Sequence, residues 1–298
     1  MDVSIIIINY NTKAFTKDCI SSIFEHTKDV NFEVIVVDNA STDGSVELLE
    51  QDARILLIKS GANLGFGRAN NIGFEQARGK YVFLLNSDTL LLNNAVKVFL
   101  DFANHTPINF GAIGCVLLNA NGVETHSVVD FKSIPRLIKF AIKKLVQKVF
   151  SLPPSFVQAK LNGNSYQEVD GVIGADMFIP STVYKAVGGF DPAYFMYGEE
   201  VDLQKRMDKL GFKRLVIRGP EIIHYEGGSS DNLAQKLSCK TVYNLQKGAL
   251  YFVKRHRSRT YYNLYKFVLL FTWFPWVLID KRFKLKEKRL LFNLIKSS

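Results

Sequence analysis

The sequence predicts an α/β fold in which a mostly parallel central sheet is flanked by helices and followed by a helical C-terminal extension. In the first third of the chain, short β-branched apolar runs alternate with helical patterns, as in a parallel sheet with crossover helices. Polar residues directly follow several of these runs, where a ligand crevice is expected. Residues 240–298 differ sharply in charge from the rest of the chain.

Each element follows from its local pattern. Short apolar runs predict strands at residues 4–9, 32–37, 54–58, 81–85 and 113–118. Helical spacing predicts helices at residues 13–25, 45–51, 93–103, 134–150 and 199–210. In the last of these, Leu203, Met207 and Leu210 form the predicted core face, and Gly211 is the expected C-cap. The first strands and helices therefore predict a Rossmann-like nucleotide-binding half.

The domain organisation follows from length and charge. With 298 residues, 47% of them hydrophobic, the chain can bury one large core. Residues 240–298 hold 14 Lys and Arg against 2 Asp and Glu, whereas residues 1–239 hold 24 against 26. We therefore expect a main domain at 1–240 and a basic, aromatic helical extension at 241–298.

Cysteine usage and the N-terminus predict a cytoplasmic protein. The three cysteines are far apart in sequence and form no CxxC pair, which excludes a disulfide framework. The chain begins directly with a strand-like segment, with no basic region or cleavage site of a secretory signal. We expect the thiols to be reduced.

An apolar, aromatic run at residues 267–279 lies between basic segments of the extension. The run is shorter than the roughly 18 to 20 residues needed to cross a bilayer and contains Pro275, which favours a place in the membrane interface. Packing on the body of the protein is the alternative. The helix predicted at 134–150 is also basic and amphipathic, and it could cover the sheet or contact a membrane. The aromatic residues of the tail are not interleaved with its charges, which argues against a nucleic-acid binder.

Polar side chains at three predicted strand ends converge on one crevice. They are Asn9 and Asn11, Asp38, and Ser87 with Asp88. Carboxylate oxygens at a rigid strand end suit Mg²⁺ or Mn²⁺, which would neutralise a bound diphosphate. The sequence therefore makes Asp88 a candidate metal ligand.

A glycine-rich segment, GANLGFGRANN at residues 61–71, is predicted to be a loop near the same crevice. Its glycines permit close backbone approach to a ligand, and Asn63 and Arg68 offer hydrogen-bond donors. Because Gly65 and Gly67 are followed by Asn70 rather than by glycine, it is not a dinucleotide-binding fingerprint.

Acidic residues crowd the first turn of the helix predicted at 199–210. The helix dipole should lower the pKa values of Glu199, Glu200 and Asp202, whereas a partly buried cleft holding a diphosphate would raise them. The sequence is compatible with either a lowered or a raised pKa for these three carboxyl groups. Further along, His224 ends an apolar run just before Gly227 and Gly228, and it would complete a metal site if it reaches the crevice.

Taken in order, these segments resemble the inverting glycosyltransferases of family 2, in particular their bacterial rhamnosyltransferase-like branch. The resemblance spans roughly residues 3–255. It rests on the following segments: SIIIINYN, VIVVDNASTDGS, NLGFGRANN, LLNSDT, GADMFIP, GGFDPAYFMYGEEVDL and HYEGGSS. It implies a GT-A fold, a nucleotide-sugar donor and a Mg²⁺ or Mn²⁺ cofactor.

The resemblance also implies residue roles. Nucleotide and donor binding falls to Asn9, Asn11, Asp38, Asn63, Arg68 and Ser87, with Asp38 on the nucleobase. Asp88 and His224 would hold the metal, and Glu200, preceded by Glu199, would be the catalytic base. Two positions depart from the family pattern, since Asn86 replaces the first acid of the DxD element and Glu200 replaces an aspartate.

The implied function is transfer of a sugar to a lipid-linked or polysaccharide acceptor. By resemblance, rhamnose is the first candidate for this sugar. The enzyme would lie at the cytoplasmic face of the inner membrane, held there by its tail. One alternative is a non-catalytic nucleotide-sugar-binding scaffold. Another is a sugar nucleotidyltransferase, but NYNTKAF offers no glycine-rich loop after the first strand. The oligomeric state, the nucleobase and the acceptor linkage stay open.

Overall fold

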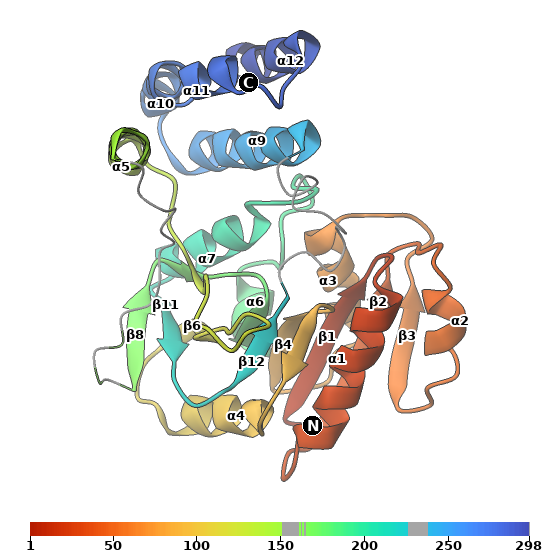
Figure 1. The fold of residues 1–298 in the computed structure, drawn as a ribbon. Helices are drawn as coiled ribbons and strands as arrows, with labels where there is room; N and C mark the ends of the chain where they lie inside the picture. The colour runs from red at the N-terminus through yellow and green to blue at the C-terminus, as the bar shows by residue number, and fades with distance from the viewer. Residues whose placement is uncertain (151–160, 162, 164, 226–237, 298) are drawn as a thin grey trace. The chain divides into compact units, whose positions relative to one another are not determined.

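The computed structural model describes residues 1–150, 161, 163, 165–225 and 238–297, and these form two compact units (Figure 1). The first unit comprises residues 1–130, 157–195 and 199–232. The second comprises residues 131–156, 196–198 and 233–298. The second unit thus combines the C-terminal segment with residues from the middle of the chain.

An eight-stranded sheet in the order β3-β2-β1-β4-β10-β6-β11-β8 forms the centre of the first unit. In that order the strands are Ile55–Lys59, Phe32–Asp38, Val3–Asn9, Tyr81–Asn86, Asp176–Pro180, Phe110–Cys115, Lys213–Ile217 and Tyr166–Val169. Strands β3, β2, β1 and β4 are parallel, as are β6 and β11. Strand β10 is antiparallel to both of its neighbours, and β8 is antiparallel to β11. The mostly parallel sheet predicted from the sequence is confirmed.

The register of the sheet gathers several strand ends at one edge. Asn9 at the end of β1 pairs with Asp38 at the end of β2, and Asn86 at the end of β4 pairs with Ile8. Strand β10 runs in the opposite direction, so its first residue, Asp176, lies opposite Leu85 of β4. The start of β10 therefore lies at the same edge as the ends of β1, β2 and β4.

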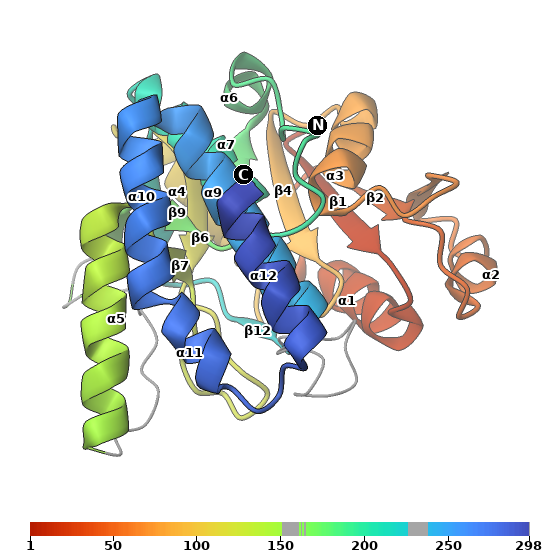
Figure 2. The ribbon, with the colours of Figure 1, turned by 90° about the horizontal axis from the view of Figure 1, so that it is seen from above.

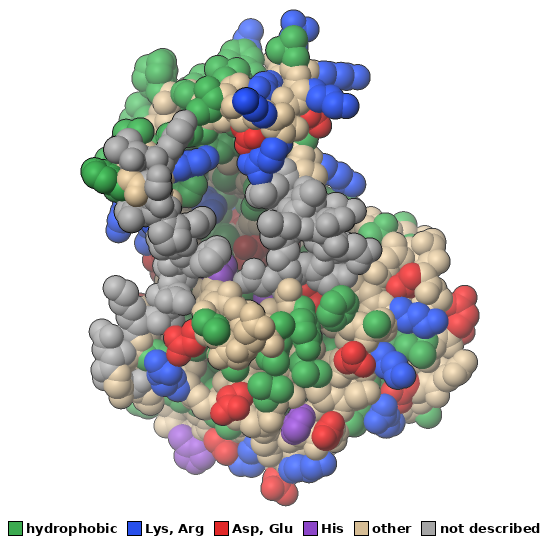
Figure 3. Space-filling model, viewed as in Figure 1, with side chains coloured by type: hydrophobic (Ala, Val, Ile, Leu, Met, Phe, Trp, Pro, Cys, Tyr) green, Lys and Arg blue, Asp and Glu red, His purple; other side chains and the backbone are tan. Residues whose placement is uncertain are grey.

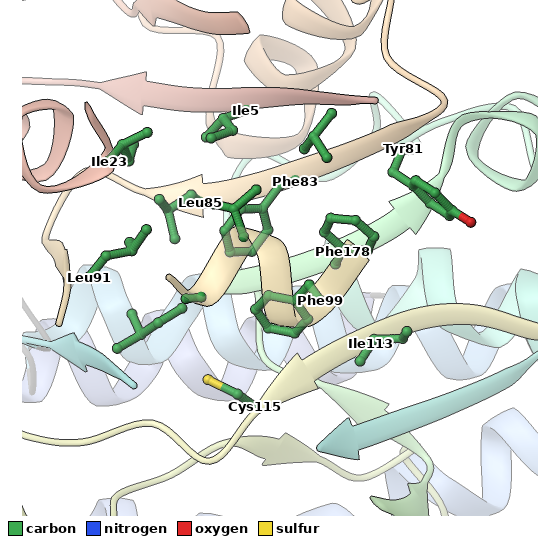
Figure 4. Close-up of a cluster of buried hydrophobic side chains, with 14 of the residues drawn as sticks. Ile5, Ile23, Tyr81, Phe83, Leu85, Leu91, Phe99, Ile113, Cys115 and Phe178 are labelled. Carbon is green, nitrogen blue, oxygen red and sulfur yellow. The ribbon is translucent and has the colours of Figure 1, made fainter. Parts of the chain in front are cut away.

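The helices of the first unit cover both faces of the sheet. They are α1 Lys13–His26, α2 Ser45–Leu49, α3 Phe66–Gln76, α4 Ala95–His105, α6 Ser181–Ala186 and α7 Glu199–Lys209. One core joins α1 and α4 to the sheet, and Figure 4 shows the rings of Phe83, Phe99 and Phe178 within it. The Phe99 and Phe178 rings stack with centroids 5.5 Å apart. Residues of α3, α6 and α7 contribute to the second core.

Two short ribbons lie beside the main sheet. Strand β5, Thr89–Leu91, pairs antiparallel with β12, Ile222–His224, and β7, Val128–Val129, pairs with β9, Gly171–Val172. In the first ribbon His224 lies opposite Thr89. This pairing brings His224 next to the residue that precedes Thr89, which is Asp88.

The second unit is helical. It contains α5 Ile134–Val149, α9 Cys239–His256, α10 Arg259–Thr272, α11 Phe274–Ile279 and α12 Leu285–Ser297. The hydroxyl groups of Ser238 and Ser258 cap α9 and α10 by accepting backbone N–H bonds. Helix α5 lies beside α10 (Figure 2), and the Ile134 N–H donates to the Tyr261 hydroxyl at 2.8 Å.

Some boundaries predicted from sequence are wrong. The strand expected at 113–118 is β6, Phe110–Cys115, because Gly111 and Gly114 make its first half read as a break while they allow close packing in the sheet. The expected loop at 61–71 becomes helical at Phe66. A Cβ at Gly67 would lie 2.9 Å from Phe190 Cβ, so this glycine serves helix packing rather than a turn.

The helix predicted at 199–210 is confirmed as α7, which ends at Lys209, and Gly211 has the left-handed φ of +82° expected of a cap. Leu203 and Met207 are buried as predicted, but Leu210 is 55% exposed because the helix has already ended. Gly227 and Gly228, expected to form a turn after His224, lie outside the described residues.

Candidate functional site

A buried hydrogen-bond network fixes the end of β1. The Asn9 Oδ1 atom accepts from the hydroxyl groups of Thr12 at 2.9 Å and Thr16 at 2.7 Å. Its Nδ2 group donates to Ser41 Oγ at 2.9 Å. Since both polar atoms of this fully buried amide already bond within the protein, Asn9 holds the loops of the site in place.

The loops after β1 and β2 hold each other. Asn11 has a φ of +53°, and its Oδ1 atom accepts from the Thr42 N–H at 2.7 Å. Its own N–H donates to Ser41 Oγ at 3.0 Å. Asn11 is exposed, so it lies at the open side of this edge.

Asp38 ends β2 with only 1% of its surface exposed. Both carboxylate oxygens accept from the Ser41 N–H at 3.1 Å, which fixes the plane of the carboxylate. The neighbouring Asn39 connects this strand end to the glycine-rich segment. Its Nδ2 group donates to Asn63 Oδ1 at 3.1 Å, and its Oδ1 atom accepts from the Leu64 N–H at 2.9 Å.

The glycine-rich segment docks on the chain just before α7. Arg68 is exposed, and its Nε group donates to the Pro192 carbonyl at 2.7 Å. The Phe66 N–H donates to the Phe195 carbonyl at 3.3 Å. A Cβ at Gly65 would lie 1.9 Å from that same carbonyl oxygen, so only glycine fits here.

The end of β4 leads to a carboxylate and an imidazole. Ser87 is buried, with its hydroxyl 3.1 Å from that of Thr12. Asp88 follows, and its Oδ1 atom lies 3.3 Å from His224 Nε2. The Asn86 amide nitrogen lies 3.4 Å from the same His224 nitrogen. The structure thus brings Asp88 and His224 together as predicted from the sequence.

This pair fits two positions of a divalent cation site. Neighbouring ligands of an octahedral Mg²⁺ or Mn²⁺ ion at about 2.1 Å lie about 3 Å apart, close to the observed Asp88–His224 separation. His224 Nδ1 is buried and has no hydrogen-bond partner among the described residues. Within the described ranges no group of three or more His, Cys, Asp or Glu side chains could hold a metal. Asp88 and His224 would therefore leave the remaining positions to diphosphate oxygens and water.

The acidic first turn of α7 holds two different carboxyl groups. Glu199 is 4% exposed, and its Oε2 atom has no partner among the described residues. Burial, together with the nearby Glu200 charge, raises the pKa of Glu199 well above its usual value. Desolvation therefore outweighs the helix dipole at Glu199. Glu200 is only partly buried, so solvent or a ligand can reach it.

Glu200 belongs to the same edge of the sheet. A Cβ placed on Gly174 would lie 3.9 Å from Glu200 Cβ and 3.5 Å from the Phe66 ring. The next residue, Ala175, accepts a hydrogen bond from the Asn86 N–H at 3.0 Å. The base predicted from the sequence is therefore close to the strand end that carries Asp88.

Asp176 is a buried acid that the sequence reasoning missed. It is completely buried at the start of β10, and its Oδ2 atom accepts from the Cys115 N–H at 2.6 Å. Its Oδ1 atom has no partner among the described residues. Burial raises the pKa of Asp176 from 3.8 to about 7, and His224 opposes that rise. The feature of the sequence that could have identified Asp176 is an acidic residue within the apolar run 175–179.

Comparisons with known proteins identify the family of the chain. Residues 4–152 match the model of the family "Glycosyl transferase family 2". An N-acetylglucosaminyl-diphospho-decaprenol L-rhamnosyltransferase of Mycobacterium tuberculosis is 27% identical over 212 residues, which cover 66% of this chain and 67% of the relative. The rhamnosyltransferase WbbL of Escherichia coli is 24% identical over 232 residues, covering 75% of this chain and 83% of that protein.

Solved structures show the same fold. The mannosyltransferase PcManGT from Pyrobaculum calidifontis, solved in complex with GDP-Man and Mn²⁺, aligns with a TM-score of 0.59 at 16% identity. The alignment covers 98% of this chain and 78% of that one. At this identity the likeness concerns the fold, and it confirms the GT-A fold that the sequence predicts.

Proposed function

The chain belongs to glycosyl transferase family 2 and is a glycosyltransferase, and we propose that it transfers one sugar from a nucleoside-diphosphate donor with inversion at the anomeric carbon. The proposal rests on the residues that lie together along one edge of the central sheet. Asp38, the Asp88–His224 pair and Glu200 all lie along it. This arrangement supports a nucleotide at one end, a cation in the middle and a base beside it.

Glu200 is the proposed general base. It takes the proton of the acceptor hydroxyl while that oxygen bonds to the anomeric carbon and the bond from this carbon to the diphosphate oxygen breaks. Glu199 suits this role less well, because it is almost fully buried, whereas Glu200 is only partly buried and can be reached by an acceptor.

Asp88 and His224 are the proposed protein ligands of Mg²⁺ or Mn²⁺. When bound, such an ion stabilises the negative charge that develops on the departing diphosphate. The structure of the mannosyltransferase PcManGT with GDP-Man and Mn²⁺ supports a divalent cation in this fold. Asp88 directly precedes β5, and His224 ends β12. Because these two strands pair, the fold sets the spacing of the two side chains before any donor arrives.

The nucleotide side is proposed to use Asp38 on the nucleobase. Asn9 and Ser87 both hydrogen-bond to the Thr12 hydroxyl at the buried side of the site, and Asn11 lies at its open side.

Asn63 and Arg68 are proposed to lie near the diphosphate or the donor sugar. Their segment is fixed by Asn39 and by the carbonyl groups of residues 192 and 195, which leaves the exposed Arg68 at the surface of the site.

The donor sugar and the acceptor are inferred from relatives. Two relatives are named rhamnosyltransferases, and one of them is named for a diphospho-decaprenol acceptor. We therefore propose rhamnose as the donor sugar and a lipid-linked or polysaccharide acceptor in cell-surface glycan synthesis.

A peripheral place at the cytoplasmic face of the inner membrane fits this acceptor. Residues 240–298 hold 14 basic and 2 acidic side chains, which suit an anionic leaflet. By length and composition, Arg259–Ile279 is a candidate membrane span of 21 residues with mean hydropathy 1.2, although α11, with Pro275 in its first turn, is a separate helix within it. We propose that this tail, residues 241–298, binds the membrane surface.

The test is a screen of nucleoside-diphosphate sugars with Mn²⁺ or Mg²⁺, reading released nucleoside diphosphate with and without chelator. We expect chelator-sensitive release from one donor. Glu200→Gln should lower turnover at least about a hundredfold while donor affinity is kept, and Glu200→Asp, which restores the usual family residue, should retain activity. Normal turnover in Glu200→Gln would refute the role of Glu200, and donor binding without any release would favour a scaffold.

A further inference from the structure

Exposed apolar side chains gather on α5, α10 and α11 of the second unit, and α12 exposes three more, which are Leu285, Leu290 and Phe292. On α5 five such side chains are each 41 to 58% exposed: Ile138, Phe140, Ile142, Leu145 and Val146. On α10 and α11 five more are 51 to 67% exposed: Leu264, Phe267, Phe271, Leu278 and Ile279. By contrast α9, with 18 residues the longest helix described in this unit, exposes one large apolar side chain, Leu245. Large exposed apolar surfaces of this kind mark binding sites.

The two groups come from distant parts of the sequence but lie side by side. Helix α5 precedes β8 in the chain, yet it packs along α10 (Figures 1 and 2). The Ile134 N–H donates to the Tyr261 hydroxyl, and the Lys144 ammonium lies 5.1 Å from the centre of the Trp276 ring. These contacts join the first residue of α5 to α10 and its second half to α11.

The charge around these helices is almost entirely positive. The α5 sequence contains five basic residues and no acid, and residues 240–298 add 14 basic and 2 acidic residues. Figure 3 shows Lys and Arg side chains among the hydrophobic ones over this unit. Apolar side chains bordered by basic ones fit the headgroup region of an anionic bilayer, where the apolar part enters the interface and the cations meet lipid phosphates.

We infer that α5 joins α10 and α11 in one lipid-binding surface, so that the membrane contact is built from the middle of the chain as well as from its tail. This inference deepens the proposed membrane association and rests on it, but not on the proposed reaction. The surface lies in the interface rather than across the bilayer, because five charges on the 16 residues of α5 oppose its insertion into hydrocarbon.

The test measures binding of the full-length protein to sedimented vesicles of phosphatidylcholine with and without phosphatidylglycerol. Two variants remove apolar contacts, Phe140→Glu/Ile142→Glu on α5 and Phe267→Glu/Phe271→Glu on α10. Leu245→Glu on α9 is the control for a glutamate at a similarly exposed site, and it makes half of the charge change of each double variant. Each double variant removes two buried apolar side chains from the membrane contact, so each should lose binding about tenfold or more. The control should change about twofold or less.

The outcomes separate the alternatives. Normal binding by the α5 variant with loss in the α10 variant would overturn the inference in favour of the tail alone. Equal binding by all variants, or no preference for anionic vesicles, would also overturn it, as would resistance to alkaline extraction, which indicates a spanning helix. Circular dichroism checks that each variant is folded. Donor hydrolysis in solution should be unchanged in every variant, so failure of the proposed reaction would be seen separately.

Discussion

Replacing Asp176 by asparagine should make the protein more stable at neutral pH. The carboxyl group is completely buried, and only its Oδ2 atom has a partner among the described residues, the Cys115 N–H at 2.6 Å. Asparagine has nearly the same shape, and its carbonyl oxygen can accept that hydrogen bond. Asparagine does not ionise, so the substitution removes the free-energy cost of burying an ionisable group.

The size of the effect follows from the pKa. Burial raises the pKa of Asp176 from 3.8 to about 7. Between these values the unfolded chain loses the proton while the folded protein keeps it, so the stability of the wild type falls as pH rises. A rise of about three pKa units, at 1.36 kcal/mol per unit, lowers the free energy of unfolding of the wild type by about 4 kcal/mol. The full loss is reached above pH 7. The variant should lack this decline, and roughly 3 kcal/mol of the difference should develop between about pH 5 and pH 8.

Urea unfolding in the presence of chelator measures this difference. Both tryptophans lie in the second unit, so their fluorescence does not report on the first. Cys19 is fully buried in the first unit, and a short pulse of methanethiosulfonate would label it only in unfolded molecules. If the stabilities of wild type and variant run parallel from pH 5 to pH 8, or if the variant is the less stable at pH 8, Asp176 is ionised in the folded protein and the reasoning is wrong.

Three further substitutions test other features of the first unit. His224→Gln should weaken Mn²⁺ binding at least about tenfold, as read by the EPR signal of free Mn²⁺, and unchanged affinity would remove His224 from the metal site. Gly65→Ala should destabilise by more than about 2 kcal/mol in urea, because its Cβ would lie 1.9 Å from a backbone oxygen, whereas Gly61→Ala, with a similar φ and open space, should cost only about 1 kcal/mol. Arg206→Met should cost about 3 to 5 kcal/mol, since it leaves the buried Asp202 carboxylate without the guanidinium 2.8 Å away; a cost below about 1 kcal/mol would contradict this.

The sequence was most informative where a pattern has one physical cause. Apolar runs with polar ends predicted β1, β2 and β4, and the parallel register then had to bring those ends together. The same reasoning placed Asp88 at the crevice. For His224 the residues gave only a conditional proposal, because its approach to Asp88 depends on the β5–β12 ribbon, whose strands are 130 residues apart.

Other features could not be predicted because they depend on packing between distant residues. The hydrogen bonds of Asn9 to Thr12, Thr16 and Ser41 involve partners whose positions no local pattern reveals. The close packing of α3 at Gly67 depends on Phe190, which lies far along the chain. The raised pKa of Glu199 reflects burial, which cannot be calculated from the acidic turn alone.

The place of β10 in the sheet also has a consequence for synthesis on the ribosome. Strands β4 and β6 follow each other closely in the chain, but β10, made about 60 residues after β6, separates them. Until β10 emerges, each of these strands has an unpaired edge that could join the other or a neighbouring chain. For β4 this interval ends when residue 180 is available, whereas β6 keeps a second unpaired edge until β11, Lys213–Ile217, is made. Chaperone dependence or aggregation of truncated chains should concentrate in this interval.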